Sequence, residues 1–153
     1  MDKLENRIPP PLVMLIIALA MGGASFLSPP LAVEGRVRFG LVALLVLLGG
    51  FVGFSAFRSF RSAETTVNPV HVERASALVS SGVYRFTRNP MYVALTSLLV
   101  AWAAYLAAPW SFLGPPVFVL FIARFQILPE ERAMTAKFGA AYLEYKSRVR
   151  RWL

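Results

Sequence analysis

The sequence predicts an all-α integral membrane protein with four transmembrane helices and a C-terminal amphipathic helix on the cytoplasmic side. Hydrophobic residues make up 57% of the 153 positions, whereas average soluble domains contain roughly 45–50%. These residues are gathered in blocks, each close to the ~20 apolar residues that a membrane-spanning helix needs. Basic residues flank the blocks, as they do where helices are anchored at a membrane interface. The length suits a single domain over residues 1–153.

The first apolar block begins with three prolines, Pro9, Pro10 and Pro11. The first turn of a helix tolerates proline, because its missing N–H has no helical partner there. Lys3 and Arg7 before this block also resemble the start of a secretory signal, but the triple proline favours a membrane span. In chain order, we predict spans at about residues 8–27, 39–57, 91–108 and 112–128.

The distribution of basic residues predicts the orientation. The segment between the second and third blocks and the segment after the fourth block carry most of the arginines and lysines. By the positive-inside rule both segments, and with them both termini, lie on the cytoplasmic side, consistent with a bacterial cytoplasmic membrane. A net charge of +8 also fits nucleic-acid binding, but bases that flank apolar blocks favour the membrane. The tail residues Arg148, Arg150, Arg151 and Trp152 suit anionic lipid headgroups.

Two further patterns concern helix packing. In the second block, Gly49 and Gly53 form a G-x-x-x-G motif, which lets two helix backbones approach closely. After the fourth block, Pro129 should kink or restart the helix, because it has no backbone N–H to donate. Apolar residues then recur at roughly helical spacing, which predicts one amphipathic helix over about residues 129–149.

The composition excludes several kinds of chemistry. Without cysteine the chain has no disulfide, zinc-thiolate site or cysteine nucleophile. His71 is the only histidine, so a multi-histidine metal site is excluded and we expect no metal. A lone histidine is also more often a surface residue than a catalytic base. The sequence contains no P-loop and no G-x-G-x-x-G after a strand. An enzyme with this sequence would therefore rely on a bound cosubstrate and on positioning.

A polar, aromatic segment at residues 82–92 lies between the second and third blocks. A membrane interface needs only a few basic anchors and a tyrosine, and this segment contains more. Pro90 fits the first turn of a helix and Asn89 its N-cap, so capping and anchoring explain these residues individually. Their joint occurrence predicts one half of a polar ligand site, with a pair of glutamates as the other half. The residues gathered in this segment are Tyr84, Arg85, Arg88, Asn89 and Tyr92, and the glutamates are Glu130 and Glu131.

Arg124 stands near the end of the fourth block, seven residues before Glu131, and on a regular helix it would share the face of Glu131. Snorkelling of its guanidinium to the interface is one interpretation. The other is an arginine facing the interior of the helix bundle, which would mark a binding site.

The motif Gly82-Val83-Tyr84, followed by Arg88-Asn89-Pro90-Met91-Tyr92, resembles the G-x-Y-x-x-x-R-H/N-P-x-Y signature of the isoprenylcysteine carboxyl methyltransferase and phospholipid methyltransferase superfamily. The second block of that superfamily is similar to Glu130-Glu131 followed by Phe138-Gly139-Ala140-Ala141-Tyr142-Leu143-Glu144-Tyr145. One predicted helical hairpin separates the two blocks. Residues 65–69 and 78–81 also look like bacterial members, so the resemblance covers roughly residues 65–153.

The resemblance implies a small integral membrane methyltransferase that uses S-adenosylmethionine and releases S-adenosylhomocysteine. It places the cofactor on the cytoplasmic side, between the signature segment and the C-terminal helix, and lets lipophilic acceptors arrive from the bilayer. The resemblance also implies the residues that line the cofactor pocket, which are Tyr84, Arg88, Asn89, Pro90, Tyr92, Glu130 and Glu131. Arg124, Gln126 and Glu130 are the candidates for orienting and activating the acceptor. The expected partners are the lipid bilayer and a lipophilic acceptor, with no nucleic acid and an open oligomeric state.

Two departures bear on the acceptor. Asn89 stands where isoprenylcysteine enzymes carry histidine, and asparagine cannot change charge near neutral pH. Gln126 stands four residues before Glu130, where those enzymes carry an arginine suited to a carboxylate. A lipid amine or a thiol thus becomes as plausible an acceptor as a prenylated cysteine, and phospholipid N-methylation is the alternative activity. Of another class are a non-catalytic membrane accessory and a lipid-binding scaffold.

Overall fold

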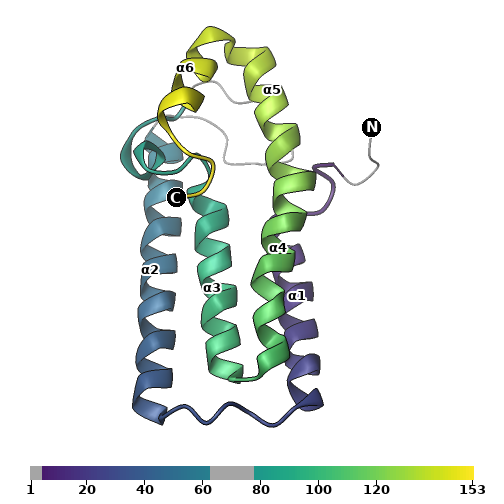
Figure 1. Cartoon of the computed structure of the whole chain (residues 1–153). Coiled ribbons are helices and arrows are strands. Elements are labelled where there is room, and N and C mark those ends of the chain that lie inside the picture. The colour runs from purple at the N-terminus through teal and green to yellow at the C-terminus, as the bar shows by residue number, and fades with distance from the viewer. Residues whose placement is uncertain (1–4, 63–77) are drawn as a thin grey trace.

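The computed structural model describes residues 5–62 and 78–153, and within these ranges its regular structure is helical. His71 and the stretch 65–69 lie outside the described residues. Four long helical columns run side by side, formed by α1, α2, α3 and the continuous column from η4 to α5, and α6 folds back over one end (Figure 1). In chain order the elements are α1 (Pro10–Ala24), η1 (Ser25–Leu27), α2 (Gly35–Ser62), η3 (Gly82–Arg85), α3 (Pro90–Leu106), η4 (Pro109–Leu113), α4 (Gly114–Ile122), η5 (Ala123–Ile127), α5 (Leu128–Phe138) and α6 (Ala140–Arg148).

Three helical stretches are long and apolar enough to cross a membrane, and they make the chain an integral membrane protein. They span Pro10–Leu27, Gly35–Ser59 and Pro109–Phe138. The apolar helix Pro90–Leu106 is shorter, at 17 residues. The predicted count of four spans therefore stays a prediction for α3. Helix α2, from Gly35 to Ser62, extends beyond both ends of the predicted second span, 39–57.

Helix α1 begins as the prolines predict. Pro9 stands at the N-cap position, and its carbonyl accepts hydrogen bonds from the N–H groups of Leu12 at 2.9 Å and Val13 at 3.2 Å. Pro10 and Pro11 then occupy the first turn, where no helical partner is lost.

Helices α2 and α3 pack closely through the predicted glycine motif. A Cβ on Gly49 would lie 3.2 Å from the carbonyl oxygen of Ala94, and a Cβ on Gly53 would lie 3.3 Å from the Cβ of Ala94. The hydroxyl of Ser97 also donates to the carbonyl of Leu45 across this contact, at 2.8 Å. The small residues thus bring the signature-bearing helix α3 against α2.

Pro129 changes the helix in a way that the sequence prediction did not specify. The helix neither breaks nor restarts at this proline but passes through a π-helical turn, η5, in which the N–H of Leu128 bonds to the carbonyl of Ala123. The carbonyl of Phe125 would normally bond to the N–H of residue 129, which proline lacks. It instead accepts the backbone N–H of Asn6, at 3.0 Å. The N-terminal segment therefore satisfies the group that Pro129 leaves open.

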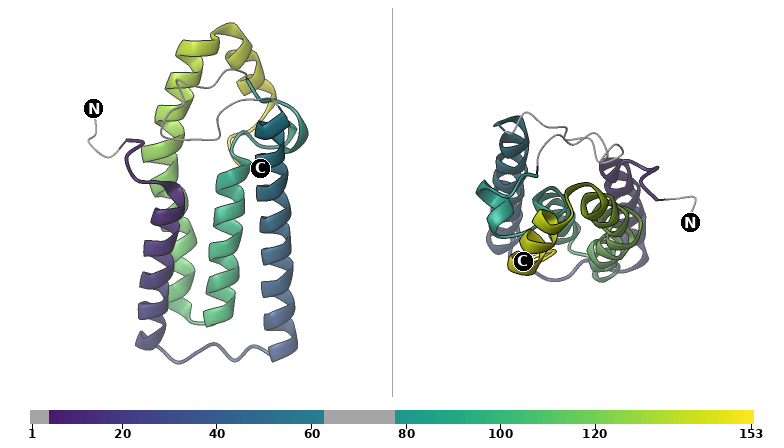
Figure 2. Two further views of the ribbon diagram at one scale, coloured as in Figure 1. Left: turned by 180° about the vertical axis from the view of Figure 1, so that it is seen from behind. Right: turned by 90° about the horizontal axis from the view of Figure 1, so that it is seen from above.

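The single amphipathic helix predicted over 129–149 is wrong, because the structure has two helices there. Helix α5 ends at Phe138 and α6 begins at Ala140. Between them Gly139 adopts φ 51° and ψ −124°, a conformation that glycine accepts far more readily than other residues. This break turns α6 back over the end of the bundle that carries the start of α3, as the view from above shows (Figure 2).

The residues after α6 return to the beginning of α3. The N–H of Arg88 donates to the carbonyl of Arg150 at 2.9 Å, so residues distant in sequence lie side by side at the end of the bundle (Figure 1). The main hydrophobic core lies below this contact and joins side chains of α1, α3, α4 and η5, among them Val13, Leu99, Phe118, Ile122 and Ile127.

Candidate functional site

The carboxylate of Glu131 lies at the centre of a buried ion-pair cluster. Arg88 Nη2 donates to its Oε1 at 2.9 Å, and Arg151 donates Nε to Oε1 and Nη2 to Oε2, both at 2.9 Å. Lys146 Nζ lies 3.2 Å from Oε2. The side chains of Glu131 and Arg88 are only 7% and 8% exposed. Three cations, from the signature segment before α3, from α6 and from the C-terminal segment, thus converge on one carboxylate of α5.

This cluster joins the two sequence blocks that were predicted to form one site. Arg88 belongs to the signature segment, and its Nη1 also donates to the carbonyl of Lys146 at 3.3 Å. Its Nε is buried and has no hydrogen-bond partner. A buried guanidinium N–H without an acceptor is costly, so this atom marks a place where a ligand oxygen would be stabilised.

Asn89 occupies the N-cap position of α3 but does not cap it with its side chain. Its Nδ2 instead donates to the carbonyl of Arg151 at 2.9 Å. The same carbonyl accepts the hydroxyl of Thr87 at 3.2 Å, and that hydroxyl accepts the N–H of Asn89. Pro90 follows in the first turn, as predicted. The capping alternative therefore explains Pro90, whereas the side chain of Asn89 serves the long-range contact.

Glu130 has a different partner from its neighbour. Its Oε1 accepts a short hydrogen bond, 2.5 Å, from the hydroxyl of Tyr92. Tyr92 belongs to the buried hydrophobic core, which also contains Ile127 and against which Trp152 packs. The two adjacent glutamates thus occupy unlike surroundings, one among cations and one against a tyrosine at the edge of the apolar core.

Three buried tyrosines lie around the cluster outside the spans. The hydroxyl of Tyr145 donates to the carbonyl of Tyr84 at 2.7 Å, which fastens α6 to the signature segment. Burial raises the pKa of Tyr142 to about 12. Burial also raises the pKa of Tyr84 and Tyr145 above the ordinary tyrosine value. All three therefore stay neutral at physiological pH. The hydrogen bond from Arg151 to Glu131 raises the pKa of Arg151, which stays charged.

Arg124 and Gln126 lie in η5, on the side of the N-terminal segment. Arg124 pairs with Glu5 at 3.1 Å, and its side chain is exposed. Gln126 is fully buried, and its Nε2 donates to the carbonyl of Ile8 at 2.8 Å while its Oε1 has no partner. Arg124 thus pairs with a residue before α1, and Gln126 bonds to another residue of the same N-terminal segment. Their assignment to the acceptor stays a prediction.

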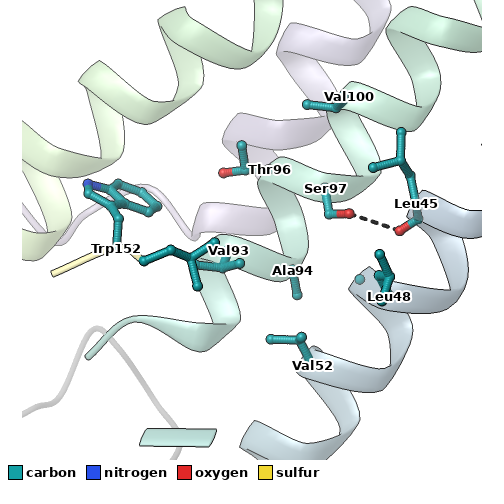
Figure 3. Close-up of a pocket in the computed structure, with 11 residues that line it drawn as sticks. Leu45, Leu48, Val52, Val93, Ala94, Thr96, Ser97, Val100 and Trp152 are labelled. Carbon is teal, nitrogen blue, oxygen red and sulfur yellow. Dashed lines mark hydrogen bonds between the residues drawn. The ribbon is translucent and has the colours of Figure 1, made fainter. Parts of the chain in front are cut away.

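An apolar groove of about 430 Å³ lies between α2 and α3 and reaches the C-terminal segment. Its walls include Leu48 and Val52 on α2, Val93 and Val100 on α3, and Trp152 (Figure 3). The ring of Trp152 stands beside Val93 at one end of the groove, one turn from Asn89 along α3. The groove therefore ends at the C-terminal segment, whose Arg151 contacts the polar cluster.

In the described parts of the chain, no group of three or more His, Asp or Glu residues could hold a metal ion. The polar cluster nonetheless offers donors, a carboxylate beside a tyrosine and an adjoining apolar surface. These features define the class of the protein, a helical membrane protein with a polar cluster at one end of its bundle and an apolar groove beside that cluster.

Comparison with known proteins then identifies the family. The family model described as phospholipid methyltransferase matches residues 37–141, and the chain belongs to this family. The match includes the signature segment and both glutamates. The protein is therefore a membrane protein of the methyltransferase type.

A protein of Haemophilus influenzae described as uncharacterised is 44% identical over 63 residues. That alignment covers 41% of this chain and 100% of the relative. No solved structure matches the chain.

Sequence reasoning missed several residues of the cluster. Arg151 was assigned to lipid headgroups, yet it contacts Glu131 and Asn89. Thr87 and Lys146 were not singled out. Thr87 stands inside the signature segment, which was a usable signal. The residues Lys146 and Arg151 belong to a basic tail, where no local pattern distinguishes a buried partner from a surface charge.

Proposed function

We propose that the protein transfers a methyl group from S-adenosylmethionine to a lipophilic acceptor at the cytoplasmic face of the membrane. The observation that carries this proposal is the meeting of the signature segment, the Glu130–Glu131 pair and the end of an apolar groove in a member of the phospholipid methyltransferase family. The cytoplasmic placement follows from the basic residues around the site.

The residues proposed to line the cofactor pocket fit an amino-acid-bearing cosubstrate. The unpartnered Nε of Arg88 is suited to a carboxylate oxygen, because charge-assisted hydrogen bonds are the strongest of this kind. The neutral ring of Tyr84 offers apolar and aromatic surface. S-adenosylmethionine supplies an activated methyl group on its sulfonium. The full set proposed for the pocket is Tyr84, Arg88, Asn89, Pro90, Tyr92, Glu130 and Glu131.

The two glutamates take different roles in this proposal. Glu131 is satisfied by three cations, so it holds Arg88 and the C-terminal segment in place rather than facing the acceptor. Glu130 bonds to Tyr92 at the edge of the apolar core, where a lipophilic acceptor would arrive. We assign to Glu130 the uptake of the proton that the acceptor releases as its nucleophilic atom binds the methyl group. Positioning of the two reactants supplies much of the rate.

The groove between α2 and α3 suits the hydrocarbon chain of the acceptor, because its walls are apolar and it ends beside the polar cluster. Two acceptor classes fit this surface. A phospholipid amine is favoured by the family match and by Gln126 in place of an arginine. A prenylated acceptor is the alternative. A non-catalytic accessory would bind neither cosubstrate nor product.

The first test is calorimetric titration of S-adenosylhomocysteine into the purified protein in nanodiscs. We expect saturable binding that is weakened at least tenfold by Asn89→Ala and by Glu130→Gln. Glu144→Gln is the matched control, because the Glu144 side chain is 70% exposed and pairs with Arg148 on the surface of α6. No binding by folded wild-type protein would overturn the proposal in favour of a non-catalytic role.

The second test uses methyl-labelled S-adenosylmethionine and a bacterial lipid extract. We expect label in the lipid fraction, and a loss of that label when Val93→Trp fills the groove while product affinity is retained. Leu47→Trp places the same side chain on an exposed position of α2 and serves as the control. Equal transfer of labelled methyl groups by the two tryptophan variants would show that the groove is not the acceptor site.

A further inference from the structure

The C-terminal segment Arg150–Leu153 contacts both halves of the site. Its residues meet the polar cluster at one end and the apolar groove at the other. Because Arg151 and Trp152 are adjacent in the chain, a displacement of one moves the other. We call this segment the strap.

The polar end of the strap is Arg151. Its guanidinium forms two hydrogen bonds to Glu131, and its carbonyl accepts the side-chain N–H of Asn89 and the hydroxyl of Thr87. One residue therefore contacts both the glutamate and the signature asparagine. The carbonyl of Arg150 adds a hydrogen bond from the N–H of Arg88.

The apolar end of the strap is Trp152 with Leu153. Both residues line the groove, and Trp152 also packs against the hydrophobic core that contains Tyr92. A hydrocarbon chain in the groove would contact the tryptophan ring directly (Figure 3). The strap is thus the part of the chain through which an occupant of the groove acts on the polar cluster.

We propose that the strap couples the two ligand sites, with Arg151 as a positioning residue for Asn89 and Glu131 and Trp152 as the contact for the hydrocarbon chain. This inference rests on the proposed function. Its consequence is that a groove occupant that holds Trp152 in place also holds Asn89 and Glu131 in place. Because coupling between two sites is reciprocal, cosubstrate binding then raises the affinity of the groove for its occupant by the same factor by which the occupant raises the affinity for the cosubstrate.

A double-mutant cycle on product binding tests the coupling. We expect Arg151→Ala and Trp152→Ala each to weaken S-adenosylhomocysteine binding by about tenfold, the order of one charge-assisted contact. The double variant should be no weaker than the weaker single variant, because both changes release the same strap. Arg151→Lys should recover part of the affinity, and Arg150→Ala is the matched control, because this residue contributes its backbone carbonyl, which the substitution keeps. If the loss of affinity in the double variant equals the product of the losses in the two single variants, the two residues act independently, and the proposed coupling through the strap is wrong.

A second measurement follows the strap directly, both without and with S-adenosylhomocysteine. In a protein with Trp102→Phe and Trp110→Phe, Trp152 is the single tryptophan. Its fluorescence in nanodiscs that contain chain-brominated phosphatidylcholine reports contact between the ring and a lipid chain. We expect strong quenching that changes when Arg151→Ala releases the strap, and that rises on addition of S-adenosylhomocysteine in the parent protein.

The outcomes separate this inference from the proposed function. Normal product binding together with quenching that neither Arg151→Ala nor the product alters would overturn the coupling and leave the proposed function intact. If folded protein binds no product, the proposed function fails. If the quenching is then also the same with and without Arg151→Ala, the proposed coupling through the strap fails as well.

Discussion

Replacing Glu131 with glutamine should destabilise the protein strongly. The substitution keeps the shape of the side chain but removes the negative charge that three cations share. Arg88 is the partner that matters most, because its side chain is 8% exposed and cannot regain full hydration.

The magnitude follows from the exposure of each partner. Breaking one buried ion pair costs about 3–5 kcal/mol. The pairs with Lys146 and Arg151 involve side chains that are 40% and 35% exposed, and such pairs contribute only about 0–1 kcal/mol each. Because glutamine keeps one acceptor oxygen, we expect a loss of roughly 3 kcal/mol. For a chain of this size that corresponds to a fall in Tm of roughly 6–12 °C.

Thermal unfolding in a single detergent, followed by circular dichroism, measures this effect. Glu144→Gln is the control, since it removes an equal charge from an exposed position of α6 and should shift the Tm by under about 2 °C. Glu130→Gln should lie between the two, because its hydrogen bond to Tyr92 survives in part. A Glu131→Gln protein that unfolds at the wild-type temperature would refute the view that this carboxylate holds the cluster together.

Three further predictions concern stability. Gly82→Ala should cost about 1–2 kcal/mol, because Gly82 has φ +60° and a Cβ there would lie 2.8 Å from the hydroxyl of Ser59; equal denaturation midpoints would contradict it. The pKa of Tyr142 is about 12 in the folded protein against an ordinary 10, so the stability that its neutral hydroxyl contributes is complete below pH 10 and is lost between pH 10 and 12. Tyr142→Phe should therefore lessen the fall in Tm over that interval. Parallel plots of Tm against pH for the variant and the wild type would rule this out. Gly49→Ala should be less stable than Gly50→Ala by about 1 kcal/mol or more, because of these two positions only Gly49 faces α3 closely enough for a Cβ to contact it. The reverse order of stability would disprove close packing at Gly49.

Much of the architecture could be predicted from local patterns. Apolar blocks of spanning length, prolines before the first block and small residues four apart each act through neighbouring residues, so the sequence displays them directly. The meeting of the signature segment with the glutamate pair was also predicted, through family resemblance, and the structure brings the two together. The helix break at Gly139 was missed, because helical periodicity continues on both sides of that glycine.

The π-helical turn was not foreseen for a different reason. A proline inside a helix leaves one carbonyl without its partner, and what happens next depends on whether another group reaches that carbonyl. Here the N–H of Asn6 does so, at the Phe125 carbonyl. This partner comes from the other end of the chain, so no sequence pattern around Pro129 could predict it.

The sequence by itself determined the membrane class, the helical content and the family of this protein. It did not distinguish Glu130 from Glu131, which are identical side chains in adjacent positions. The tertiary structure decided that Glu131 collects three cations and that Glu130 bonds to Tyr92. It also showed that Arg151 and Trp152, which belong to a basic tail in the sequence, contact Asn89 and line the groove, respectively. The reason is physical: the state of a buried carboxylate depends on which charges approach it in space, and those charges come from distant parts of the chain.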